Sequence, residues 1–131
     1  MISGLDNITS YIPQRPPFVF IDAIEEISDT TARTFFTIPE DCPLACEGAL
    51  SLAGLMENAA QTCAVRAGNK IGYIGAVKQM EALRFPSVGE TLRTEARLIQ
   101  EVLNICLMEV KTYVADELIA TTTLKIATIE A

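Results

Sequence analysis

The sequence contains no histidine among its 131 residues. Because imidazole is the base of Ser–His and Cys–His catalysis and a common metal ligand, this absence excludes those mechanisms. Basic residues are also few: 10 Lys and Arg stand against 17 Asp and Glu, giving a net charge of −7. A partner rich in phosphate requires a basic face, so this balance argues against nucleic acid and against an anionic membrane surface.

Long apolar runs and metal-binding motifs are missing as well. No apolar run approaches the roughly 18 residues of a membrane-spanning helix, and residues 1–10 lack the basic and apolar regions of a secretory signal. The cysteines lack the paired spacing of a zinc site; they are Cys42, Cys46, Cys63 and Cys106. We therefore expect a cytoplasmic protein with reduced thiols and no metal or cofactor, with a Cys42–Cys46 disulfide as the open alternative. Cys63 is expected in the core and not as a nucleophile.

The length and the hydrophobic content of 50% predict one domain, residues 1–131. A short helix is expected at 5–11 and a longer one at 51–66, where apolar residues have helical spacing. Alternating, β-branched and aromatic residues predict strands at 18–27, 31–38, 71–82, 91–102, 105–114 and 118–129. One buried helix among six strands indicates an α+β fold in which an antiparallel sheet wraps around that helix.

The long helix has two chemically different sides. On one side the residues are mostly apolar (Leu52, Met56, Ala59, Ala60 and Cys63), and on the other they are mostly polar (Gly54, Glu57, Asn58, Gln61 and Thr62). Glu57 and Gln61 are four residues apart, so their side chains should be neighbours. Glu57 also borders the apolar arc, where partial desolvation would suit a general acid or base. The alternative, a solvated glutamate on an exposed stripe, remains open at this point.

Three segments resemble the 3-hydroxyacyl-[acyl-carrier-protein] dehydratases of type II fatty acid synthesis. Residues 12–22 (IPQRPPFVFID) are similar to their Pro-His-Arg-x-Pro-Phe signature, and residues 57–61 (ENAAQ) resemble their Glu-Ala-x-Ala-Gln helix motif. Residues 86–92 (PSVGETL) resemble their Pro-x-x-Gly-Asp-x-Leu turn. The likeness extends from residue 11 to residue 129. It implies a hotdog fold, normally a dimer with a continuous sheet.

The departures from that pattern concern the chemistry. Residues 40–46 (EDCPLAC) occupy the place of the family's His-Phe-Pro-Gly segment, which holds the dehydrating histidine. Gln14 stands where the signature histidine would be, and Ser51 and Leu52 replace the Pro-Gly that opens the helix. These features are closer to divergent dehydratase-like subunits of aryl polyene pigment pathways. Glu57 and Gln61 match residues of the family, and Gly75 matches less closely. No residue of this sequence matches the family's histidine base.

The resemblance implies a set of site residues and partners. Glu57 is the expected catalytic residue, and Gln14, which can only hydrogen-bond, is expected to bind substrate or support the site. Gln61 and Gly54 are expected in the same supporting role, and the backbone amide of Gly75 as an oxyanion contact. The expected partners are an acyl-carrier protein or a coenzyme A thioester, and either a second copy or a related dehydratase. Arg15 and Arg66 are candidate contacts for the acidic helix of a carrier protein.

Three functions remain open from the sequence. The first is dehydration of carrier-bound 3-hydroxyacyl thioesters in fatty acid or polyene biosynthesis, weak alone or dependent on a partner subunit. The second is a hotdog acyl thioesterase that uses Glu57 with Gln61 or Gln14. The third is a non-catalytic subunit that shapes the tunnel of an active dehydratase. The extent of the resemblance ranks the thioesterase below the other two.

Overall fold

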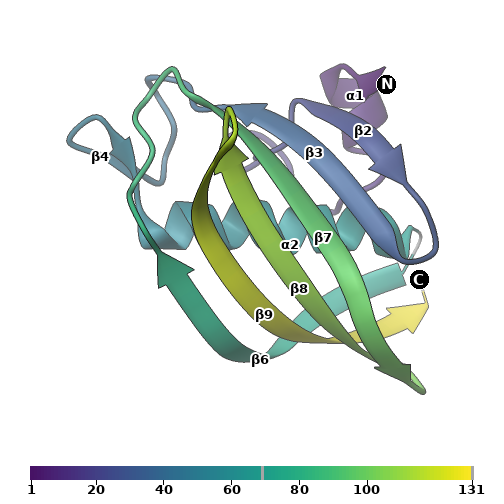
Figure 1. Ribbon diagram of the computed structural model, residues 1–131. Helices are drawn as coiled ribbons and strands as arrows, with labels where there is room; N and C mark the ends of the chain where they lie inside the picture. The colour runs from purple at the N-terminus through teal and green to yellow at the C-terminus, as the bar shows by residue number, and fades with distance from the viewer. Residues whose placement is uncertain (69, 131) are drawn as a thin grey trace.

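A computed structural model describes residues 1–68 and 70–130, and it consists of a curved antiparallel sheet around one long helix (Figure 1). The sheet order is β1-β2-β3-β7-β8-β9-β6. Its strands are β1 Ile2–Ser3, β2 Ala23–Ile27, β3 Thr31–Thr37, β6 Lys70–Ala82, β7 Thr91–Val102, β8 Ile105–Val114 and β9 Glu117–Glu130. The helices are α1 Leu5–Ile8 and α2 Leu52–Ala67, and a small second sheet pairs β4 Ala45–Cys46 with β5 Ala49–Leu50. The α+β architecture is therefore as predicted, with the short β1, β4 and β5 in addition.

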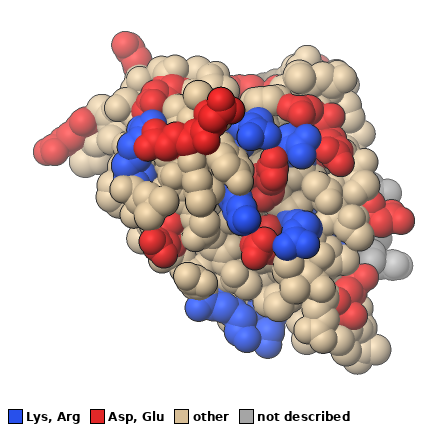
Figure 2. All heavy atoms as spheres, viewed as in Figure 1, with Lys and Arg blue, Asp and Glu red and all other residues tan. Residues whose placement is uncertain are grey.

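The inner strands β7 and β8 begin and end at the residues that the sequence predicts. In β7 the side chains of Leu92, Thr94 and Ala96 are buried against the helix side of the sheet. The residues between them face outward, where Arg93 and Arg97 pair with carboxylates at 2.9 and 3.1 Å. Figure 2 shows the outcome, acidic and basic side chains interspersed over the outer face of the sheet. No helix in the described part of the chain is long and apolar enough to cross a membrane.

Helix α2 confirms the predicted helix to within one residue at each end. The hydroxyl of Ser51 accepts a hydrogen bond from the Gly54 amide at 3.2 Å, which caps the N-terminus. Gly68, at a φ of 68°, ends the helix in a conformation that favours glycine.

The buried surface of α2 is not only apolar: Ala59 and Cys63 pack against the sheet, and polar residues are buried beside them. Asn58, Gln61 and Thr62 are 0% exposed, whereas Leu52 on the apolar side is 47% exposed. The buried polar atoms are paired: Thr62 Oγ1 lies 2.8 Å from Thr34 Oγ1, and Thr94 Oγ1 donates to Asn58 Oδ1 at 2.7 Å. Because these groups satisfy one another, the polar side can be buried at little cost. Part of the apolar side is consequently left uncovered.

The prediction of a strand over residues 18–27 is wrong in its first half, because β2 begins only at Ala23. The backbone of Phe18 and Phe20 is hydrogen-bonded to side chains of α2 and not to a neighbouring strand. Asn58 Nδ2 donates to the Phe20 carbonyl at 2.8 Å, and Gln61 Nε2 donates to the Phe18 carbonyl at 2.7 Å. These amides supply the partners that a strand would otherwise need.

Gly54 sets how closely α2 approaches the β4–β5 hairpin. A Cβ at this position would lie 2.6 Å from Leu50 Cγ and would collide with Leu50 Cδ1. Since Leu50 is fully buried, its side chain has no free space to move into.

We predict that Gly54→Ala lowers the free energy of unfolding by about 1 kcal/mol, measured by urea denaturation. Overpacking typically costs about 1–3 kcal/mol, which exceeds the roughly 1 kcal/mol that alanine gains over glycine within a helix. In a Leu50→Ala background the space exists, so the same Gly54→Ala change should there be stabilising. Equal effects of Gly54→Ala in both backgrounds would contradict this account.

Candidate functional site

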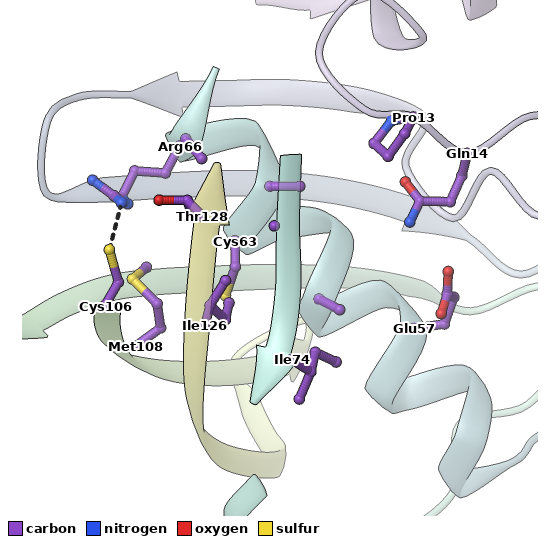
Figure 3. A pocket seen from close by; sticks show the side chains of 14 residues that line it. Pro13, Gln14, Glu57, Cys63, Arg66, Ile74, Cys106, Met108, Ile126 and Thr128 are labelled. Atoms are coloured by element: carbon purple, nitrogen blue, oxygen red, sulfur yellow. Dashed lines mark hydrogen bonds between the residues drawn. The ribbon is translucent and has the colours of Figure 1, made fainter. Parts of the chain in front are cut away.

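A pocket of about 170 Å³ lies between α2 and the strands β6, β8 and β9 (Figure 3). Glu57 and Gln14 lie at one end of it, and Arg66 and Cys106 lie at the other. The wall between them is formed by small and apolar residues, among them Ala60 and Met108. The volume is below the roughly 300–1,000 Å³ of ordinary ligand sites, which fits a slender ligand or a site completed by another chain.

The Glu57–Gln61 pair forms as the spacing predicts. Gln61 Nε2 donates to Glu57 Oε1 at 3.0 Å and also to the Phe18 carbonyl, while Gln61 Oε1 accepts from the Phe20 amide at 2.8 Å. Both N–H groups of the Gln61 amide are therefore used. Gln61 is fully buried and does not line the pocket. It orients Glu57 and anchors the segment that follows Gln14, and it has no free donor for a substrate.

Gln14 contributes an unsatisfied acceptor to the pocket. Its Oε1 atom is buried and has no hydrogen-bond partner among the described residues. A buried carbonyl oxygen without a donor costs about 1–3 kcal/mol, so a ligand that supplies a donor would relieve this cost. Gln14 and Glu57 come from different parts of the chain and lie near one another at the same end of the pocket (Figure 3).

The two glycines expected at the site lie outside it. Gly54 packs against Leu50, as described above, and does not line the pocket. Gly75 is exposed, at an irregularity of β6 where the pairing with β9 shifts between Ile74 and Ala76. Gly72, on the same strand, does line the pocket, and a Cβ there would lie 3.2 Å from Ile126 Cγ2. The structure therefore leaves Gly72 as the glycine that lets β6 approach the cavity.

Cys42, Cys63 and Cys106 are buried, whereas Cys46 is exposed. Burial raises the pKa of Cys63 to about 12, although the nearby Arg66 opposes this shift. The Cys63 thiol is thus protonated at neutral pH and is not an activated nucleophile, as expected. Cys42 and Cys46 form no disulfide. Across the described residues, no three or more Cys, Asp or Glu side chains are grouped in a way that could hold a metal ion.

Sequence reasoning did not place Arg66 in the pocket. The sequence offers Arg15 and Arg66 only as candidate contacts for a carrier protein, whereas Arg66 lines the cavity. Its guanidinium reaches Asp29 and Cys106, which are 37 and 40 residues away in sequence. The alternation of β8 does indicate that Cys106 and Met108 point inward, but no local signal shows which helix residue meets them.

Comparison with models of known protein families shows the family of this chain. The model of the ApeP-like family, described as ApeP dehydratase, matches residues 6–130. The chain belongs to the ApeP-like dehydratase family. A search of curated proteins found no significant match.

Solved structures confirm the hotdog fold. The dehydratase heterocomplex ApeI:P from Xenorhabdus doucetiae matches with a TM-score of 0.86 and 17% identity, over 94% of this chain and 91% of that one. Cj0977, a sigma28-regulated virulence protein from Campylobacter jejuni, matches with a TM-score of 0.79 and 14% identity over 93% of both chains. A hypothetical thioesterase with coenzyme A from Streptococcus pneumoniae matches with a TM-score of 0.72 and 14% identity, over 82% of this chain and 85% of that one. The protein is thus a dehydratase-like member of the hotdog fold.

We predict that Gln61→Leu lowers the free energy of unfolding by about 2–4 kcal/mol, because it leaves the Phe18 carbonyl and the Phe20 amide without partners. Gln100→Leu, at an exposed glutamine of β7, is the matched control and should change stability by less than about 0.5 kcal/mol. Hydrogen exchange gives the specific measurement, since the Phe20 amide should lose its protection in Gln61→Leu alone. Unchanged protection of that amide would show that Gln61 does not anchor the segment.

Proposed function

We propose that the protein is a subunit that dehydrates 3-hydroxyacyl thioesters, with Glu57 as its acid–base group, and that it works together with a histidine-containing relative. The observation that carries the proposal is the placement of Glu57: its carboxylate lines a mostly apolar pocket and is oriented by the buried Gln61 amide. Membership of the ApeP-like dehydratase family supports the same reaction class.

The reaction requires two proton transfers, and this chain supplies one group for them. A base removes the C2 proton, the electron pair of that C–H bond forms the C2=C3 double bond, and the C3–O bond breaks. An acid then protonates the departing hydroxide, which leaves as water. The Glu57 carboxylate can accept the C2 proton and, once protonated, can donate it. Gln14 cannot take up a proton at neutral pH, so it is limited to hydrogen-bonding the substrate.

The surface beside the pocket is suited to a partner chain. Strand β6 ends the sheet order, so one of its edges has no neighbouring strand within the described chain. Its side chains Tyr73, Ile74 and Val77 are exposed, as is Leu52 of α2. An apolar edge strand of this length is a template for pairing with another chain. Ile74 also lines the pocket, so a chain paired there would adjoin the site.

We infer that the occupant of this edge is a second copy of the chain or, in the active assembly, a related dehydratase subunit. The similar ApeI:P structure is a dehydratase heterocomplex, which supports the second arrangement. A partner that carries a histidine would supply the missing second proton-transfer group beside Glu57. We expect the thioester to be bound to an acyl-carrier protein or to coenzyme A, in the cytoplasm and in fatty acid or polyene biosynthesis. The coenzyme A in the similar thioesterase supports binding of such thioesters.

A thioesterase is the second candidate, because that similar fold carries coenzyme A. Hydrolysis would require Glu57 and a neighbouring amide to position a water molecule. The donors of Gln61 are already used, so only Gln14 is available for this role. The apolar character of the pocket wall favours the dehydratase, which uses no water as a reactant.

We predict that the chain alone sediments at twice its 14.2 kDa mass at micromolar concentration. Val77→Lys places a charge on the exposed face of β6 and should shift the mass to that of a monomer. Ile27→Lys, at an exposed residue of β2, is the control and should leave the mass unchanged. A wild-type monomer, or a dimer that tolerates Val77→Lys, would mean that β6 is not the pairing edge.

We predict that the isolated chain dehydrates 3-hydroxyacyl carrier thioesters slowly, and that a histidine-containing relative raises the rate above that relative's own level. Glu57→Gln should remove this increment, since an acid–base group contributes about 10²–10⁴ in rate. Glu109→Gln, on the outer face of the sheet, should retain it.

The other outcomes separate the remaining functions. Fast dehydration by the chain alone would overturn the need for a partner and leave Glu57 as the sole acid–base group. Release of free thiol from the thioester would identify a thioesterase. A partner-dependent increment that survives Glu57→Gln would identify a non-catalytic subunit.

A further inference from the structure

The end of the pocket opposite Glu57 contains a cation that no carboxylate neutralises directly. Arg33, Arg84, Arg93 and Arg97 each form an ion pair at 2.9–3.1 Å. Arg66 forms none with any described side chain, although it is the arginine that lines the cavity. A guanidinium that is partly enclosed without a counter-ion is costly to desolvate, so it favours an anionic ligand.

The hydrogen bonds of Arg66 leave one edge of the guanidinium without an oxygen acceptor. Arg66 Nη1 donates to the Asp29 carbonyl at 2.7 Å, which fixes the side chain. Nη2 contacts Cys106 Sγ at 3.4 Å, and sulfur is a weak acceptor. Nε is buried and has no hydrogen-bond partner among the described residues. The Nε–Nη2 edge is the fork that binds a carboxylate or phosphate through two parallel hydrogen bonds.

The carboxylate of Glu101 is close to this group but reaches it only through a thiol. Cys106 Sγ donates to Glu101 Oε2 at 3.1 Å, so the sulfur lies between the carboxylate and the guanidinium. Glu101 therefore does not occupy the open edge of Arg66. A ligand oxygen at that edge would replace the weak contact with sulfur and satisfy Nε at the same time.

The two charged ends are separated by an apolar passage. Glu57 and Arg66 are nine residues apart on α2, which corresponds to about 13–14 Å along the helix axis. Figure 3 shows them at opposite ends of the pocket, with Cys63, Ile74 and Ile126 between them. The pocket thus fits an apolar chain whose reacting carbons lie at Glu57 and whose anionic oxygen lies at Arg66.

We propose that Arg66 is an anion-binding subsite of this pocket, which takes a carboxylate or phosphate oxygen of the bound ligand. This proposal deepens the proposed function and rests on it. The oxygen has two possible sources, a carboxylate at the far end of the acyl chain or the phosphate of the pantetheine arm. Either source would place an anionic oxygen against the Nε–Nη2 edge of the guanidinium.

The test is calorimetric titration of the full chain with pantetheine thioesters of an alkanoic acid and of the alkanedioic acid of equal chain length. Each is used with and without the terminal phosphate of the pantetheine arm. One of the two anionic groups should tighten binding roughly tenfold or more over the neutral ligand. The group that does so identifies the source of the oxygen.

Substitutions then test whether the tighter binding of the anionic ligand depends on Arg66. Arg66→Gln should abolish the preference for the anion, so that the neutral and anionic thioesters bind with equal affinity. Arg66→Lys retains the charge and should keep part of the preference, and it remains usable if Arg66→Gln unfolds through loss of the Asp29 contact. Arg97→Gln, at an exposed arginine on the outer face of the sheet, should keep all of it.

With thioesters that bind, two results would overturn the proposal. One is equal affinity of the wild-type chain for neutral and anionic ligands, and the other is a preference that persists in Arg66→Gln. If no thioester binds the wild-type chain, the proposed function fails, and octanoate and octyl phosphate then test the subsite directly. Binding of either that depends on Arg66 would support the subsite, and its absence would overturn it.

Discussion

The hydrogen bonds of the Gln61 amide connect the fold of this protein to its site. One buried amide, with all of its polar atoms paired, holds the Phe18–Phe20 backbone against α2 and holds the Glu57 carboxylate toward the pocket. The segment that it anchors begins at Phe18, shortly after Gln14, whose side chain forms part of the pocket wall. Inside the protein an unpaired amide of this kind would cost several kcal/mol, so the network is stable only when it is complete. Its completeness allows polar residues of α2 to be buried.

This arrangement explains which parts of the fold could be predicted. Strands β7 and β8 follow from alternation alone, because one face of each contacts the core and the other faces water. The long helix follows from its spacing and from Gly68, but its orientation does not. Apolar patterning predicts that Leu52 is buried and Asn58 is exposed, whereas Asn58 is buried with partners on Phe20 and Thr94. Those partners lie 38 and 36 residues away, so no local pattern reveals them. The same long-range bonds explain why residues 18–22 are not a strand.

Some residues of the site could likewise be predicted from the sequence, and others could not. Glu57 and Gln61 could be found because a spacing of four residues makes helix neighbours, and Gln14 could be found only through the resemblance to a dehydratase signature. Arg66 could not be found, because its place in the pocket depends on the turn that contains Asp29 and on the inward face of β8. An arginine near a helix end is usually a surface residue. Only the packing of these elements encloses it.

Of the two residues that match the helix motif, Glu57 and Gln61, only Glu57 requires an explanation from function. Gln61 is required by the fold, since it pairs with two backbone groups, so a glutamine at this position is explained without any catalysis. Glu57 makes one hydrogen bond to Gln61, a bond that a glutamine at position 57 could also accept. Its carboxylate lines a mostly apolar pocket and forms no ion pair with a described side chain. The fold therefore gives no reason for a carboxylate at this position, whereas proton transfer does. In a chain that contains no histidine, Glu57 is therefore the residue whose chemistry has to be explained by function.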